Sequence, residues 1–335
     1  MTIEPRPKCK DIFGVFYAKD DRMLLCRAAV AILAMCSAVT HAETITVNDG
    51  SKFTISGGVN TYDGVNVSSG RVEVVGVDTV VTSAIGVAEQ QIGNRGGFYI
   101  RSGKVVNLAS DKSAAAAGSR LSYLGDGYIQ LDDGRYEQLG SCSWAANNMC
   151  AGATFMQYGG ESYFAHRGNG WTWTVGGGSS GATSISQKSH AHLYVRSGHA
   201  TVSSVVLQTP ANDGGVASFT ADGPNAVIEF TKSCTLQLSA KDYSHTTLVV
   251  NNGGTIKVST PLVRFKTKAE TPHARLLASA NGGCLQLTEN VNVFGGAADG
   301  EKRVDGVYIY ENGLVLDTNG HSTTNYAALV APTGK

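Results

Sequence analysis

Residues 98–105 (FYIRSGKV) and 193–200 (LYVRSGHA) decide the fold of this chain. Each segment reads as a strand with alternating apolar and polar residues, a glycine turn, and the start of a second strand. Gly103 and Gly198 supply the positive φ that a tight bend needs. Because the two segments are close copies that lie far apart, we treat them as two copies of one repeating unit.

Looser copies of this unit follow along the chain, each with alternating apolar residues on both sides of a Gly or Asn-Gly turn. With one glycine per copy as an anchor, most intervals are close to 30 residues, and one longer interval contains a further, unmarked unit. The anchors are Gly70, Gly103, Gly127, Gly198, Gly223, Gly254, Gly283 and Gly313.

A unit of about 30 residues cannot bury its apolar face alone, whereas stacked units can. We therefore predict a right-handed parallel β-solenoid over residues 43–335, with about nine or ten coils that stack roughly 4.8 Å apart. Backbone hydrogen bonds should then link residues about 25 to 35 apart in sequence. The alternative is a pair of antiparallel β-sandwich domains, because these also have short strands and frequent glycine turns.

The alternation also predicts which side chains face the core. Ile100 and Val195 should be buried, while Arg101 and Arg196 reach solvent. The two tyrosines of the repeated segments, Tyr99 and Tyr194, should lie along the outer wall. Hairpins that close at the glycine turns would instead indicate the sandwich.

Composition and local sequence argue against a nucleic-acid-binding protein and against a dinucleotide-binding enzyme. The chain has 41 Gly among 335 residues, 16% charged residues and no net charge, so it lacks the positive surface that nucleic-acid binding needs. Residues 176–181 (GGGSSG) match the letters of a dinucleotide-binding loop. No amphipathic helix follows them, so we expect no cofactor.

The N-terminus resembles a secretory signal. Arg27 precedes the apolar stretch 28–39 (AAVAILAMCSAV), and the small residues Thr40 and Ala42 stand at −3 and −1 of a cleavage site. We expect residues 1–42 to be leader and signal peptide, with Met23 as an alternative start, and the mature chain to be secreted or displayed on the cell surface. Cys142 and Cys150 close a short loop and are predicted to form a disulfide in that oxidising compartment.

Residues 140–181 depart from the repeat and hold all three tryptophans. Trp171 and Trp173 lie on the same face of a strand. Exposed, they would stack on sugar rings or on a protein partner. Turned inward, they would fill the core, and this interpretation is favoured because most tryptophans are buried. Tyr158 and Tyr163 are further candidates for ligand contact.

No metal site or catalytic set is expected. His190 and His192 alternate on one strand face and His199 follows the next turn, but no Cys or carboxylate completes a metal site. Asp132-Asp133 and residues 264–266 (RFK) match two of the motifs of polygalacturonases. They lie about four coils apart, which is too far to act on one sugar.

The repeating units resemble the β-helical passenger regions of bacterial autotransporter-like surface proteins. The resemblance covers roughly residues 44–319. The chain differs from that family in lacking a C-terminal membrane-spanning barrel, so we expect a truncated chain or another export route.

The resemblance implies a non-catalytic stalk or adhesin whose partner is a glycan or a cell-surface protein. Two alternatives remain. One is a polysaccharide-active enzyme of the parallel β-helix type, and the other is a glycan-binding module centred on the tryptophans.

Overall fold

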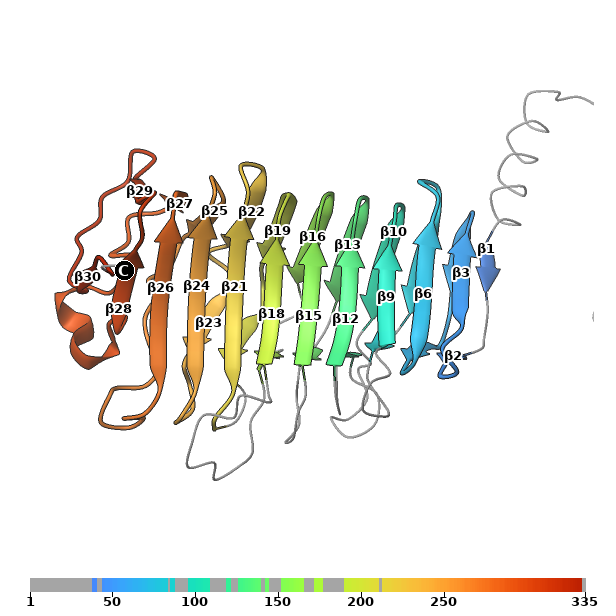
Figure 1. Cartoon of the computed structure of the whole chain (residues 1–335), viewed down its shortest axis with the longest axis horizontal. Coiled ribbons are helices and arrows are strands. Elements are labelled where there is room, and N and C mark those ends of the chain that lie inside the picture. The colour runs from blue at the N-terminus through green and yellow to red at the C-terminus, as the bar shows by residue number, and fades with distance from the viewer. Residues whose placement is uncertain are drawn as a thin grey trace, which may run out of the picture. The chain divides into compact units, whose positions relative to one another are not determined.

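The computed structural model describes residues 38–40, 44–83, 85–87, 96–108, 119–121, 126–139, 142–144, 152–165, 172–176, 190–210 and 213–332. From Thr44 onward the described chain is a parallel β-solenoid, as the sequence predicts (Figure 1). Each coil contributes one strand to each of two or three sheets, which run along the solenoid. A short strand, β1 (Ala38–Thr40), precedes Thr44.

Sheet C has eleven strands, and most of them lie side by side across Figure 1. In order they are β3 (Lys52–Ser56), β6 (Gly70–Val75), β9 (Gly96–Ile100), β12 (Asp126–Leu131), β15 (Gly152–Gln157), β18 (His190–Val195), β21 (Val216–Asp222), β24 (His245–Asn251), β26 (Arg275–Asn281), β28 (Gly306–Ile309) and β30 (Leu329–Val330).

Sheet A follows sheet C in each coil, after a short turn. From β4 onward its strands are β4 (Val59–Thr61), β7 (Val80–Ser83), β10 (Lys104–Leu108), β13 (Arg135–Leu139), β16 (Glu161–Ala165), β19 (Gly198–Val202), β22 (Ala226–Phe230), β25 (Thr255–Val258), β27 (Gly283–Leu287) and β29 (Leu314–Asp317).

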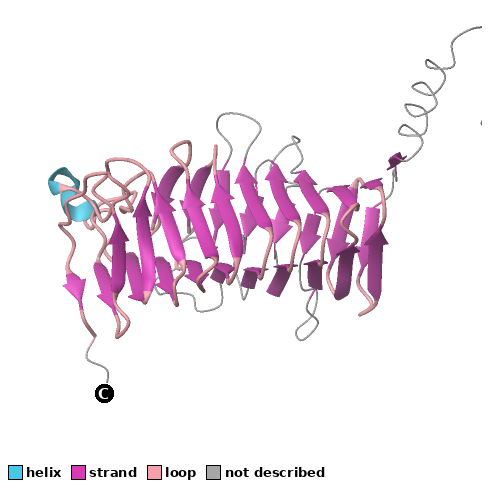
Figure 2. Cartoon of the chain, turned by 90° about the horizontal axis from the view of Figure 1, so that it is seen from above, coloured by secondary structure: helices cyan, strands magenta, loops and turns pink. Residues whose placement is uncertain are grey.

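Sheet B forms the third side and has eight strands. They are β2 (Thr44–Val47), β5 (Gly64–Val67), β8 (Ile85–Val87), β11 (Ser119–Leu121), β14 (Cys142–Trp144), β17 (Thr172–Val175), β20 (Val206–Thr209) and β23 (Thr235–Leu238). Beyond β23 this side is irregular, and Figure 2 shows the 3-10 helix η2 (Ala297–Lys302) near the C-terminal end of the solenoid.

Pairing between coils confirms the predicted parallel arrangement. Ile100 pairs with Leu131, and Val195 pairs with Ala221. The sequence separation of both pairs lies within the predicted range of about 25 to 35 residues. The first coils are shorter, since Lys52 already pairs with Arg71. The coil that follows β15 is longer than predicted.

The core forms because each strand turns alternate side chains inward. Ile100 and Val195 are both fully buried, as predicted, whereas the side chain of Arg101 is 37% exposed and that of Arg196 is 56% exposed. One inward column runs through all eleven strands of sheet C: Phe53, Val72, Phe98, Ile129, Phe155, Leu193, Phe219, Leu248, Ala278, Val307 and Leu329.

Two of the glycine anchors need correction. Gly70 begins β6 and pairs with Gly96, whereas Gly127 lies inside β12 and pairs with Gly96 and Ala153. Neither glycine therefore lies in the turn between sheets C and A that holds Gly103 and Gly198. The turn glycines of the unmarked coils are Gly134 and Gly160, which stack in line with Gly103 and Gly198. Sequence spacing missed them because the intervals between coils are unequal.

The described parts of residues 140–181 follow the repeat instead of departing from it. They form β14, β15, β16 and β17, which take successive places in the three sheets. The predicted leader, apart from β1, lies outside the described residues, so the signal peptide stays a prediction.

Candidate functional site

Four tyrosines gather on the outer face of sheet C. Tyr99 lies in β9, Tyr128 in β12 and Tyr194 in β18, and Tyr158 follows β15 directly. These four strands are neighbours in the sheet, so each of four successive coils contributes one tyrosine. At about 4.8 Å per coil they span roughly 15 Å along the axis. Tyr99 and Tyr194 share one register column, whereas Tyr128 lies two residues to one side of it and Tyr158 two residues to the other. We call these four residues the tyrosine face.

The rings of the tyrosine face remain partly open to solvent. Tyr158 is 43% exposed, and the other three are half-buried. The rings of Tyr99 and Tyr128 lie 5.8 Å apart between centroids, at an angle of 51°. Such tilted rings present both apolar faces and edges to the outside.

The hydroxyls of Tyr128 and Tyr194 stay protonated at neutral pH. Burial raises the pKa of Tyr128 well above its usual range, and its hydroxyl donates to Oε1 of Gln130 at 3.0 Å. Burial also raises the pKa of Tyr194, whose hydroxyl donates to the carboxylate of Asp222. The face therefore combines flat apolar surface with neutral hydroxyl groups.

The two repeated segments build the same arrangement twice. In the first, the guanidinium of Arg101 lies 4.9 Å from the centroid of the Tyr99 ring and pairs with the carboxylate of Asp132 on the next coil. In the second, Arg196 lies 5.8 Å from the ring of Tyr194 and 3.9 Å from Asp222, again on the next coil.

The repetition follows from the register. Each arginine comes directly after its sheet C strand, so its neighbour on the next coil is the residue at the same position of the following unit. In both units that residue is an aspartate.

Glu73 extends the first arrangement by one more coil. Its carboxylate lies 3.5 Å from Arg101 and also pairs with Lys52. A hydrogen bond from Lys52 lowers the pKa of Glu73, and a hydrogen bond from Tyr194 lowers that of Asp222. The charged side chains along this face therefore largely pair with each other.

The aromatic residues that the sequence suggests as ligand contacts do not all lie on the tyrosine face. Trp173 is buried and stacks on Phe164, with ring centroids 4.6 Å apart and an angle of 7°. Its indole therefore fills the core, which is the favoured of the two interpretations. Tyr163 points outward from sheet A and is half-buried. Trp171 lies outside the described residues, so of the four candidates only Tyr158 is found on the tyrosine face.

The cysteine pair also falls largely outside the described residues. Cys142 begins β14, whereas Cys150 is not described, so their disulfide stays a prediction. Cys234 is a buried free thiol whose pKa is raised to about 12 by burial. Cys284 is a free, half-buried thiol.

The three histidines do not meet at one point. His190 and His192 are neighbours on the outer face of sheet C, with ring centroids 5.1 Å apart. His199 lies on sheet A, where its Nε2 is 2.9 Å from the carboxylate of Glu229. Within the described ranges, no group of three or more His, Cys, Asp or Glu side chains is suited to hold a metal ion.

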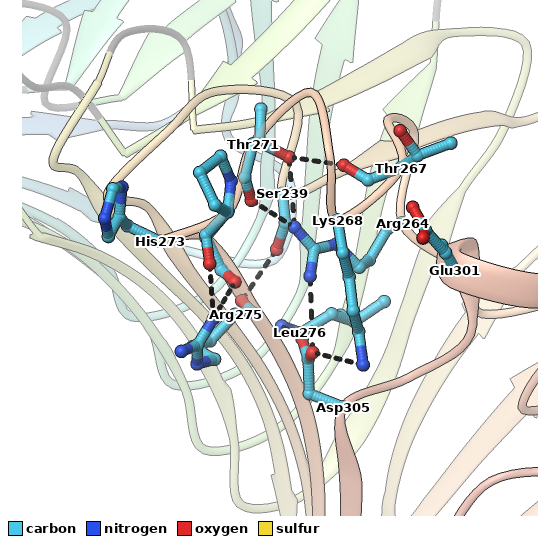
Figure 3. A network of polar contacts seen from close by, with 12 residues as sticks. Ser239, Arg264, Thr267, Lys268, Thr271, His273, Arg275, Leu276, Glu301 and Asp305 are labelled. Atoms are coloured by element: carbon cyan, nitrogen blue, oxygen red, sulfur yellow. Dashed lines mark hydrogen bonds and ion pairs between the residues drawn. The ribbon is translucent and has the colours of Figure 1, made fainter.

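The polygalacturonase-like motifs are separated, and Arg264 has another role. Its side chain is fully buried, and its Nη2 donates to the carbonyl and hydroxyl oxygens of Thr271 at 2.5 Å and 3.0 Å. Its Nη1 lies 3.2 Å from Asp305, which also pairs with Lys268 at 3.3 Å (Figure 3). Arg264 therefore holds two loops together and is not open to a substrate.

The alternation of the repeated segments places Tyr99 and Tyr194 on the outer wall but does not connect them with Tyr128 and Tyr158. The signal that would have found the face is the alternation within residues 126–131, which places Tyr128 on the outward side once Gly134 is taken as the turn.

The described residues contain no helix long and apolar enough to span a membrane. Comparison of the chain with protein-family models, curated protein sequences and solved structures gave no match.

Proposed function

We propose that this chain is an exported, non-catalytic β-solenoid that acts as a stalk or adhesin-like binding protein, and that its tyrosine face binds a neutral glycan. The observation that carries the proposal is one outward tyrosine on each of four successive coils. Such a face, staggered across the strands and extended along the solenoid axis, suits an extended polymer better than a compact small molecule.

The chemistry of the face favours a neutral ligand. Tyrosine rings offer flat apolar surface and hydroxyl groups, which match the apolar faces and hydroxyl groups of a sugar ring. Arg101 lies between the carboxylates of Glu73 and Asp132, and Arg196 lies beside Asp222. Because these charges are already paired, the face has little net charge with which to attract an acidic polymer.

The test is binding of the purified chain to an array of immobilised glycans, compared with a Tyr158→Ala, Tyr194→Ala variant. Each ring removed should cost about 1 kcal/mol, which is roughly fivefold in affinity. Tyr163→Ala removes a matched tyrosine from the outer face of sheet A and should leave binding unchanged.

Three results would contradict the proposal. The first is binding that survives loss of both tyrosines. The second is binding that prefers acidic glycans and falls steeply with salt, because it would indicate a charged site elsewhere. The third is binding to a cell-surface protein with none to glycans, which would favour the other class of partner.

A polysaccharide-active enzyme is the second candidate, and one observation favours it. Side chains from three adjacent coils converge on the outer face of sheet C, with Arg101 between Glu73 and Asp132. A glycosidase needs one carboxyl group with a raised pKa to act as general acid, whereas the pKa of Glu73 is lowered. The test is release of reducing ends from a polysaccharide by the purified chain. If the chain has this activity and Asp132→Asn abolishes it, the proposed function would be that of an enzyme and not that of a binding protein.

A further inference from the structure

The apolar column along sheet C is open at both ends. Inside the solenoid its members are buried, including Val72 beside the first strand and Val307 beside the last. At the ends, Phe53 in β3 is 39% exposed and Leu329 in β30 is 57% exposed. Each of these side chains points to the core but is covered on one side only, because in the described chain no further strand of sheet C lies beyond β3 or β30.

Exposed apolar side chains concentrate near these two ends. Among the described residues, the large apolar side chains that are exposed fall between residues 53 and 77 or between 310 and 329, apart from Tyr158 and Phe265. Leu316 illustrates the cause. It is 37% exposed although its column partner Leu285 is 3% exposed, because β29 is the last strand of sheet A in the described part of the chain.

Among the described residues, no strand pairs with the outer backbone edge of β3 or of β30. An edge strand that carries apolar side chains is a ready template for pairing with another strand. The edges of β3 and β30 belong to the same parallel sheet and point the same way along their strands. The backbone N–H and C=O groups of one edge can therefore hydrogen-bond to those of the other, as the strands of two successive coils do.

We propose that copies of this chain associate head to tail, with β30 of one copy pairing in parallel with β3 of the next. Leu329 would then lie over Phe53 and continue the apolar column from one copy into the next. In this register Lys52 faces Ala328 and Thr54 faces Val330, so no like charges meet. Because the contact joins two different surfaces along one axis, it does not close on itself and builds filaments.

The test is sedimentation of the purified chain over a range of concentrations. The wild-type chain should form a series of species that grows with concentration. Phe53→Asp and Leu329→Asp should each remain monomeric, because each removes one of the two contact surfaces and a buried, unpaired carboxylate opposes the contact. Phe265→Asp is the matched control, since Phe265 is 44% exposed and lies apart from both ends, and it should assemble as the wild type does.

A mixture of the two variants gives the sharpest outcome. Phe53→Asp keeps an intact Leu329 end, and Leu329→Asp keeps an intact Phe53 end, so the mixture should form dimers and nothing larger. Thermal unfolding of each variant confirms that it is folded. A wild-type chain that stays monomeric, a Phe53→Asp variant that still associates alone, or a mixture that stays monomeric would each overturn the proposal.

Discussion

At the scale of single residues, the turn glycines show how closely successive coils approach. Gly134 has a φ of +89°, and a Cβ added there would lie 2.2 Å from the carbonyl oxygen of Gly103 on the preceding coil. Gly160 and Gly198 make the same approach to the glycine before them, at 2.3 Å. Glycine is thus required by both the backbone angle and the stacking of coils.

Gly134→Ala should destabilise the solenoid much more than Gly313→Ala. Gly313 has a similar φ of +78°, but a Cβ there would meet nothing within 4 Å. Both changes should cost roughly 1–2 kcal/mol for the left-handed backbone angle, and Gly134→Ala adds the clash with Gly103. Urea unfolding of the two variants measures the difference, and equal losses would show that the coils separate to admit a methyl group.

His192 should make stability depend on pH. Burial, followed by the neighbouring His190, lowers the pKa of His192 from 6.5 to about 4. Above pH 6.5 the imidazole is neutral in both the folded and unfolded states, and its contribution to stability is fully present. Between pH 6.5 and 4 the unfolded state binds more protons, so the free energy of unfolding falls, by at most about 3 kcal/mol.

The measurement is urea unfolding at pH 7.5, 6, 5 and 4 for wild type and His192→Gln. The variant should lose most of the decline in this window. His321→Gln, which changes a histidine outside the sheets, should keep it. A decline that is the same in all three chains would assign the pH dependence to other groups.

At the scale of elements, the C-terminal coils replace a strand of sheet B with loops held by a buried ion pair. Arg264 forms an isolated parallel bridge with Leu238 of β23, so its backbone continues the sheet by one residue. Its side chain reaches Thr271 on one loop and Asp305 on another (Figure 3). The backbone N–H of Leu276 donates to the second oxygen of Asp305 at 2.7 Å, which ties the pair to β26.

Arg264→Met should therefore destabilise this end of the solenoid by about 3 kcal/mol, because Asp305 loses its buried partner and keeps only Lys268, which is 51% exposed, as an ion-pair partner. Lys232→Met is the control. Lys232 is 77% exposed and lies 3.3 Å from Glu289, so its loss should cost less than about 1 kcal/mol. Thermal unfolding monitored by circular dichroism compares the two. An Arg264→Met chain as stable as the control would show that the loops hold without the ion pair.

At the scale of the whole molecule, the coils act as one body because each depends on its neighbours for burial. Aromatic rings connect several coils through the core. Trp173 stacks on Phe164 and meets Phe219 edge-on, at a centroid distance of 6.2 Å, and Phe219 meets Phe230 at 5.6 Å. The tyrosine face and the proposed head-to-tail contact both use this regular spacing, one on the outer wall and the other at the ends.

Export of the chain is a prediction at this scale. If the signal peptide ends at Ala42, N-terminal sequencing of protein recovered outside the cytoplasm should begin at Glu43. Replacing Ala42 with a bulky residue, as in Ala42→Trp, should slow or abolish this cleavage because the −1 position takes small side chains. Exported protein that begins at Met1 or Met23 would contradict the interpretation.

The sequence by itself determined the type of fold and the direction of most side chains. Alternation is a local property, so residues 98–105 and 193–200 were enough to place Ile100 and Val195 in the core and both arginines outside. The glycine turns are equally local, because a positive φ is a requirement on one residue. Together with a recurring length, these patterns favoured a parallel solenoid over a sandwich, and the pairing between coils decided between them.

Only the tertiary structure decided which outward side chains become neighbours. The partner of a residue lies on the next coil, and coil lengths vary from that between Lys52 and Arg71 to that between Gly152 and His190. A spacing near 30 residues therefore cannot give the register. Tyr128 joined the tyrosine face, and Asp132 met Arg101, because hydrogen bonding between coils fixed the register.

The register between coils also decided the surroundings of two residues whose environment the sequence left open. Trp173 filled the core and Arg264 was buried between loops, since each environment depends on what the neighbouring coils present to it.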